Sequence, residues 1–145
     1  MSDEVLSEDS IVLAGTARSM DDAINESGRL LVAAGAVDDS YVDAMHEREK
    51  SVSTFMGNGL AIPHGTNEAK PLIRRTAISF VRYDEPIDWK GQPAEFVVGI
   101  AGAGDDHLSV LSSLAGIFTD DDAIERLRSA SAPADVLKAL GDVSA

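Results

Sequence analysis

The apolar and polar residues of this 145-residue chain follow one another in patterns that predict strands and helices in turn. The apolar run IVLA at 11–14 predicts a strand, and Ser19 then opens a helical pattern that Gly35 ends. A second helix is expected to begin at the polar residues DDS at 38–40 and to continue to about Lys50.

Three apolar segments in the rest of the chain predict further strands: LAI at 60–62, TAISFVRY at 76–83 and FVVGIAG at 96–102. The last of them is continuously apolar, which is typical of a strand that is buried on both faces. Pro133 suits the first position of a helix, and helical patterns cover residues 107–118, 121–129 and 133–140. Strands interleaved with helices predict an α/β sandwich.

The length and the even composition indicate one folded domain at residues 11–145, preceded by a flexible N-terminal tail at residues 1–10. The tail, MSDEVLSEDS, is acidic and polar, unlike a secretory signal. Although 44% of the residues are hydrophobic, no run reaches the roughly 20 apolar residues that a membrane helix needs. We therefore expect a cytoplasmic protein without direct membrane insertion.

Composition and charge remove several classes of function. The chain has no cysteine, which excludes disulfides, thiolate metal sites and a cysteine nucleophile on this chain. Acidic residues outnumber basic ones by 25 to 12, and the resulting net charge of −13 repels nucleic acid and anionic membrane surfaces. Neither is expected as a partner.

The segment GNGLAIPHGT at 57–66 places a histidine where a strand must end. Pro63 lacks an N–H group and restricts the residue before it to extended geometry, so the strand stops as His64 begins. Gly65 then allows a turn without a side chain that would crowd the imidazole. A reactive histidine and a histidine that merely caps a loop both fit this spacing.

His107 can be placed by its angle around the predicted helix. At about 100° per residue it continues the apolar stripe of Leu111, Leu114 and Phe118, so it should point inward from the first turn. The free N–H groups of a helix start favour an anion there. The alternative is a core histidine bonded to a backbone carbonyl.

Arg48 can likewise be placed by its angle around the second predicted helix. It shares a face with Tyr41 and Met45 near the end of that helix, which makes it a candidate anion ligand. The alternative is an arginine that extends from the edge of the core or pairs with a carboxylate. His46 directly precedes the charged segment EREK at 47–50, on a charged face of the same helix, and we expect it to be exposed to solvent.

The segment HEREKSVSTFMGNGLAIPHGTNEAK at 46–70 closely resembles the signature of the IIA domains of the bacterial phosphotransferase system, in the mannitol and fructose class. A second segment, DDHLSVLSSLA at 105–115, resembles the part of that family that carries a second active-site histidine. The resemblance covers about residues 11–141, and the continuation HGTNEAK is more similar to the mannitol branch. It implies a three-layer α/β sandwich with a mixed sheet of about five strands flanked by helices.

The resemblance also implies a role for each candidate residue: His64 accepts a phosphoryl group, His107 is its neighbour and Arg48 is the nearby cation. The donor would be the phosphocarrier protein HPr and the acceptor a cysteine of a IIB domain, for the uptake of mannitol or fructose. A neutral imidazole suits this role, because it is nucleophilic near pH 7 and its phosphoramidate remains energy-rich. The chain would be a phosphotransferase component with a phosphohistidine intermediate, and it would need no cofactor or metal.

Two other functions stay open at this point. A regulatory module of the same kind could use the phosphorylation state of His64 to control a partner protein without feeding sugar uptake. A metal site could form from His64, His107 and either Asp105 or Asp106, since two histidines and a carboxylate can bind zinc.

Overall fold

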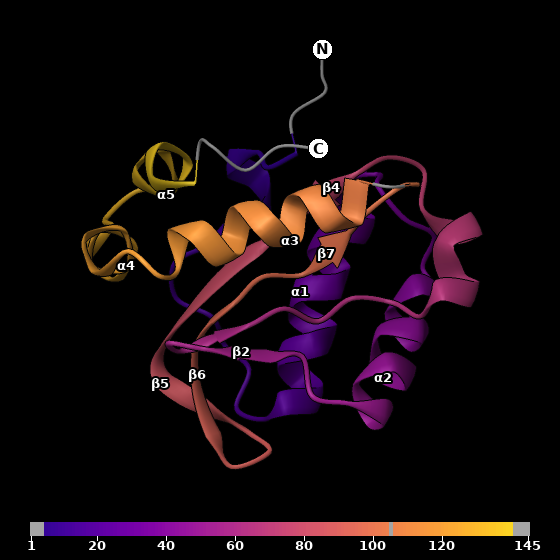
Figure 1. The fold of residues 1–145 in the computed structure, drawn as a ribbon, viewed down its shortest axis with the longest axis horizontal. Coiled ribbons are helices and arrows are strands. Elements are labelled where there is room, and N and C mark those ends of the chain that lie inside the picture. The colour runs from indigo at the N-terminus through magenta and orange to yellow at the C-terminus, as the bar shows by residue number, and fades with distance from the viewer. Residues whose placement is uncertain (1–4, 105, 141–145) are drawn as a thin grey trace.

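The computed structural model describes residues 5–104 and 106–140, and within them a mixed sheet lies between two layers of helices (Figure 1). The sheet has five strands, in the order β1 (Ile11–Val12), β5 (Phe80–Trp89), β6 (Gln92–Val97), β3 (Leu60–Ala61) and β2 (Phe55–Gly57). The β1–β5 and β3–β6 pairs are parallel, whereas β5–β6 and β2–β3 are antiparallel. A smaller antiparallel pair joins β4 (Ala77–Ile78) to β7 (Ile100–Ala101). The predicted fold class is confirmed.

The first helical layer consists of α1 (Met20–Ala33) and α2 (Tyr41–Ser51), which pack on each other and on one face of the sheet. Ser19 caps α1 as predicted, because its hydroxyl accepts a hydrogen bond from the Asp22 N–H at 3.2 Å. Gly35 follows the helix with φ of 74°, a conformation that glycine adopts without a steric penalty. The local signals in the sequence therefore set both ends of α1.

The second layer is formed by α3 (Asp106–Ile117), α4 (Asp121–Ser129) and α5 (Pro133–Ala139), and Figure 1 shows α4 and α5 gathered near one end of α3. The protein has two hydrophobic cores, one on each face of the sheet, and successive strand residues point into different cores. Phe80 and Phe96 pack in the core beneath this second layer, while Val81 and Val97 pack in the core beneath α1 and α2. This explains why the strand segments are continuously apolar. Among the described residues, no helix has the length and apolar character needed to cross a membrane.

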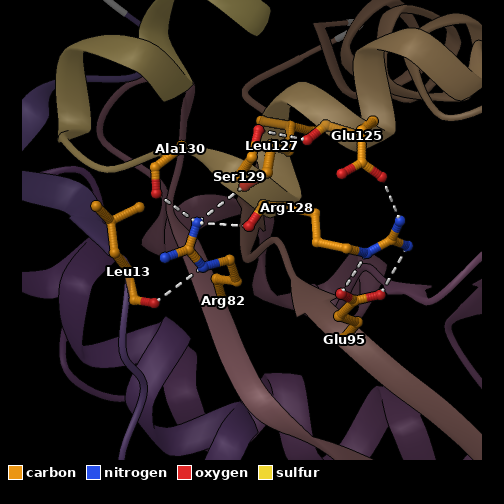
Figure 2. A network of polar contacts seen from close by, with 8 residues as sticks. All are labelled: Leu13, Arg82, Glu95, Glu125, Leu127, Arg128, Ser129 and Ala130. Carbon is orange, nitrogen blue, oxygen red and sulfur yellow. Dashed lines mark hydrogen bonds and ion pairs between the residues drawn. The ribbon is translucent and has the colours of Figure 1, made fainter.

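Arginines connect the strands of the sheet to α4 (Figure 2). The Arg82 guanidinium on β5 donates to the carbonyl oxygens of Leu127, Arg128 and Ala130, where α4 ends, and to that of Leu13. The last carbonyls of a helix lack i+4 N–H partners within the helix, so at the end of α4 the guanidinium supplies donors for them. Arg128 in turn donates to both carboxylate oxygens of Glu95 on β6, at 2.7 and 3.0 Å. The α4 end is thus held to two neighbouring strands.

The predicted strands differ from the observed ones in the middle of the chain. The segment 76–83 is divided at Ser79, whose hydroxyl donates to the Ser27 carbonyl of α1, and β5 then continues to Trp89. The segment 96–102 is likewise divided, into β6 and β7, and β6 already begins at Gln92. The β5–β6 hairpin turns at Lys90 and Gly91, both with positive φ. β2 and the 3-10 helix η2 (Asn67–Leu72) were also not predicted from the sequence.

Residues 5–10, which were expected to belong to a flexible tail at residues 1–10, pack against the fold instead. Val5 and Leu6 pack against the core beneath α3 to α5, and the Val5 carbonyl accepts a hydrogen bond from the Ile78 N–H at 2.8 Å. A short 3-10 helix, η1 (Glu8–Ser10), follows, and Ser10 is buried. The apolar pair within an acidic segment is the reason for this packing. Residues 1–4 lie outside the described residues.

Candidate functional site

His64 follows β3 after Ile62 and Pro63, where the extended chain runs beside β7. The Pro63 carbonyl accepts a hydrogen bond from the Ile100 N–H at 3.0 Å, and His64 itself forms a parallel bridge with Ile100. The Nδ1 atom of His64 is 2.8 Å from the Ile62 carbonyl oxygen. A carbonyl only accepts, so Nδ1 carries the proton and the neutral ring keeps its lone pair on Nε2. The backbone hydrogen bond thereby selects Nε2 as the nitrogen that keeps its lone pair.

Gly65 is required by the close approach of Tyr41. The Tyr41 hydroxyl accepts a hydrogen bond from the Gly65 N–H and donates one to the Ile100 carbonyl, both at 2.9 Å. A Cβ atom at position 65 would lie 2.6 Å from the Tyr41 ring, which is closer than side chains normally pack. The glycine after the histidine therefore lets a buried phenol fix the chain on the far side of His64.

His107 lies next to His64, as the family resemblance implied. The two ring centroids are 4.8 Å apart and the ring planes are inclined by 52°. His107 occupies the first turn of α3, and Leu114 and Phe118 of the same stripe are buried in the core. A Cβ atom at Gly102 would lie 2.6 Å from the His107 Cα, so this glycine lets the helix start approach the strand.

A cavity of about 280 Å³ is lined by His64, His107, Arg48 and Lys70, among others. The Arg48 Nη1 donates to the Val52 carbonyl at 2.7 Å, and the Lys70 Nζ donates to the Gly104 carbonyl at 2.9 Å. Arg48 is half-buried rather than fully inward, because the line of Tyr41 and Met45 continues into the core at Glu49 instead. Two cationic side chains beside two histidines make the cavity suitable for an anion.

The electrostatic surroundings keep both rings neutral at pH 7. Burial lowers the pKa of His64, and the nearby Arg48 guanidinium lowers it further, against the opposing effects of the Ile62 hydrogen bond and Glu49. Burial also lowers the pKa of His107 to about 4, with smaller contributions from His64, Lys70 and Arg48. A neutral His64 keeps a lone pair that can act as a nucleophile, and the Arg48 and Lys70 side chains that line the same cavity suit an anion.

His46 does not have the expected exposure. Its Nε2 lies 2.8 Å from the Asn25 side-chain oxygen, its Nδ1 lies 3.9 Å from Asp21, and its side chain is only 26% exposed. The prediction was wrong because it treated the charged face of α2 as solvated, whereas α1 packs against that face. His46 does not line the His64 cavity, so it remains a suitable control.

The proposed metal set is not assembled among the residues that the structure describes. No group of three or more histidine, cysteine, aspartate or glutamate side chains there could hold a metal ion. The Asp106 carboxylate instead accepts a hydrogen bond from the Thr76 hydroxyl at 2.6 Å. Asp105, the other candidate, lies outside the described residues.

Sequence reasoning missed four residues that shape the site: Tyr41, Glu49, Lys70 and Gly102. Tyr41 was recognised only as part of an apolar stripe, although a buried phenol normally requires a hydrogen-bond partner, which was a usable signal. Lys70 was part of the recognised segment HGTNEAK, but nothing in its spacing indicated that η2 turns it towards the cavity.

Residues 4–143 match the family model of the phosphoenolpyruvate-dependent sugar phosphotransferase system, EIIA 2. The chain belongs to this family, and it is therefore a phosphotransferase component. It is 45% identical over 144 residues to the mannitol-specific phosphotransferase enzyme IIA component of Halalkalibacterium halodurans, covering 99% of each chain.

Solved structures agree with this assignment. The crystal structure of IIA mannitol from Escherichia coli superposes with a TM-score of 0.85 at 36% identity, covering 92% of this chain and 97% of that one. The Escherichia coli complex of IIA mannitol with phosphorylated IIB mannitol gives 0.86 at 34% identity, covering 93% and 96%. The fold and the family predicted from the sequence are both confirmed.

Proposed function

We propose that this protein carries a phosphoryl group from phospho-HPr on Nε2 of His64 to a cysteine of a IIB domain. The observation that carries the proposal is the Nδ1 hydrogen bond of His64 to the Ile62 carbonyl at 2.8 Å. It leaves a neutral nucleophilic nitrogen in a ring that lines a cavity together with Arg48 and Lys70. The pair of histidines and the cations are what such a transfer needs.

The transfer itself requires little beyond position and charge. The Nε2 lone pair forms a bond to phosphorus while the bond from phosphorus to the donor breaks, and the donor keeps that electron pair. Negative charge is spread over three equatorial oxygens in the transition state. Arg48 and Lys70 offset this charge. His107, which is neutral at pH 7 and whose ring centroid lies 4.8 Å from that of His64, supplies an N–H donor.

The relatives support the choice of partner and sugar. The name of the Halalkalibacterium halodurans relative favours mannitol over fructose, as does the segment HGTNEAK. The Escherichia coli complex with phosphorylated IIB supports a IIB domain as the acceptor. This chain has no cysteine, so the thiol that receives the phosphoryl group must belong to that partner. Exchange with these partners would take place in the cytoplasm.

The test is phosphorylation of the purified chain with phosphoenolpyruvate, enzyme I and HPr. The wild type and the control His46→Ala should gain one acid-labile phosphate, and His64→Ala should gain none. Adding an excess of an unphosphorylated mannitol IIB domain should then move the phosphate from this chain to the IIB cysteine. Phosphate that stays on His64 would support the regulatory alternative, and labelling of His64→Ala would refute the assignment of the acceptor.

A further inference from the structure

A buried carboxylate lies behind the site, at the end of α2. The Glu49 side chain is only 2% exposed, although it belongs to the charged segment EREK. One oxygen accepts from the Thr54 hydroxyl at 2.5 Å, and the other accepts from the Thr54 N–H and the Trp89 indole N–H, each at 3.0 Å. A buried carboxylate is costly unless such donors surround it.

Lys90 completes the surroundings of Glu49. Its ammonium nitrogen is 3.7 Å from the carboxylate and also donates to the Glu49 carbonyl. Glu49 therefore joins three parts of the fold: the end of α2, the residue before β2, and the turn of the β5–β6 hairpin. These parts are far apart in the sequence, and the carboxylate fixes their separation.

A chain of hydrogen bonds continues from Glu49 to the reacting ring. The Thr54 carbonyl accepts from the Ile62 N–H at 3.0 Å, and the Ile62 carbonyl accepts from Nδ1–H of His64 at 2.8 Å. On the opposite side, the carbonyls of Ala61 and Pro63 accept from Val98 and Ile100, at 2.9 and 3.0 Å. Ile62 is thus held from the sheet on one side and from Thr54 on the other, and Glu49 holds Thr54.

We propose that Glu49 is a positioning residue for phosphoryl transfer, which acts through Thr54 and Ile62 to keep the His64 proton on Nδ1. If Thr54 shifts, the Ile62 carbonyl moves with it and the Nδ1 proton loses its acceptor. In some molecules the proton then moves to Nε2 and removes the nucleophilic lone pair. The role of Glu49 in transfer rests on the proposed function of His64.

Glu26 is a matched control for a purely structural carboxylate. It accepts from the Thr16 and Ala17 backbone N–H groups, both at 3.2 Å, and from the Tyr83 hydroxyl at 2.6 Å. These donors closely parallel those of Glu49: backbone amides and an aromatic side chain. Among the described residues, however, neither Glu26 nor its donors line the His64 cavity.

The experiment measures the His64 tautomer by ¹⁵N NMR in the unphosphorylated chain, and the rate of phosphoryl transfer from phospho-HPr. Glu49→Ala should mix the two tautomers and slow transfer on the order of ten- to a hundredfold, as misplaced reacting groups commonly do. Glu49→Gln should restore the tautomer and stay within about threefold of the wild-type rate. Its carbonyl can accept from Thr54 and Trp89, and its amide can donate to the Thr54 hydroxyl. Glu26→Ala should leave the tautomer unchanged.

A folded Glu49→Ala protein with the wild-type tautomer and rate would overturn the proposal. If Glu49→Ala does not fold, Glu49→Asp decides, because it keeps the charge but is one methylene too short to hold both donors in place. Mixed tautomers in Glu49→Asp support the proposal, and a single wild-type tautomer refutes it. The NMR measurement needs no phosphoryl donor. Absence of labelling on wild-type His64 would therefore refute the carrier function while the link from Glu49 to the ring is decided separately.

Discussion

Removing the hydroxyl of Tyr41 tests how the chain around His64 is held. Tyr41→Phe keeps the buried ring, which is 2% exposed, and deletes one oxygen that bonds both the Gly65 N–H and the Ile100 carbonyl at 2.9 Å. The change creates almost no cavity, so its effect reports on these hydrogen bonds. Because Gly65 follows His64 directly, the change should affect both stability and transfer.

The structure sets the size of the effect. A buried polar group that loses its partner costs about 1–3 kcal/mol, and the Ile100 residue is fully buried. The parallel bridge between His64 and Ile100 lets the Gly65 N–H turn towards the Ile100 carbonyl, which replaces part of the loss. We therefore expect about 1–2 kcal/mol. For a domain of this size that lowers the melting temperature by about 3–6 °C.

Thermal unfolding followed by circular dichroism, together with the phosphorylation assay, measures both effects. The control is Tyr83→Phe, which removes a hydroxyl that donates to Glu26 at 2.6 Å and lies outside the cavity lining. It should lower the melting temperature and leave the transfer rate unchanged. If Tyr41→Phe melts within about 1 °C of the wild type and transfers at the wild-type rate, these hydrogen bonds do not hold the His64 segment.

Three further results are expected. The first concerns pH: the folded protein lowers the pKa of His64 and holds that of His107 at about 4, so on acidification these histidines take up protons in the unfolded state before they do so in the folded state. The free energy of unfolding, measured with denaturant at a series of pH values, should therefore be constant above about pH 6.5 and fall towards pH 4. Gly102→Ala, whose Cβ meets the His107 backbone at 2.6 Å, should cost about 1–3 kcal/mol and slow transfer, whereas Gly116→Ala in open space on α3 should stabilise by up to about 1 kcal/mol. His107→Ala should slow transfer on the order of 10²–10³-fold, and His107→Gln should recover most of the rate if only its N–H donor matters; a normal rate in both variants would make His107 a packing residue.

The helices could be predicted because their signals are local. Ser19 caps α1 and Pro133 begins α5 without help from distant residues. The β5–β6 hairpin could not be predicted, because the segment DEPIDWKGQPAE is polar and Pro86 and Pro93 argue against strands. Its strands form because Ile87, Trp89 and Ala94 pack into the core over α1 and α2, which is a property of the assembled fold.

The same distinction between local signals and distant partners applies to the residues of the His64 site. His64 and His107 could be placed from a proline, a glycine and a helical stripe, all of which act within a few residues. Glu49 and His46 could not, since both lie in a segment whose charges suggest solvent. Their burial depends on Trp89 and Asn25, which come from other elements. Side chains that act through distant partners leave no local pattern.

The sheet separates two hydrophobic cores, and the His64 cavity is lined by side chains from both sides of the sheet. Arg48 and Tyr41 come from the layer of α1 and α2, His107 comes from α3 in the other layer, and His64 extends from the sheet between them. No fragment that keeps only one helical layer would contain the site. The capacity to accept a phosphoryl group should therefore be lost when either helical layer unfolds locally. Measuring this activity would then report whether the whole domain is folded.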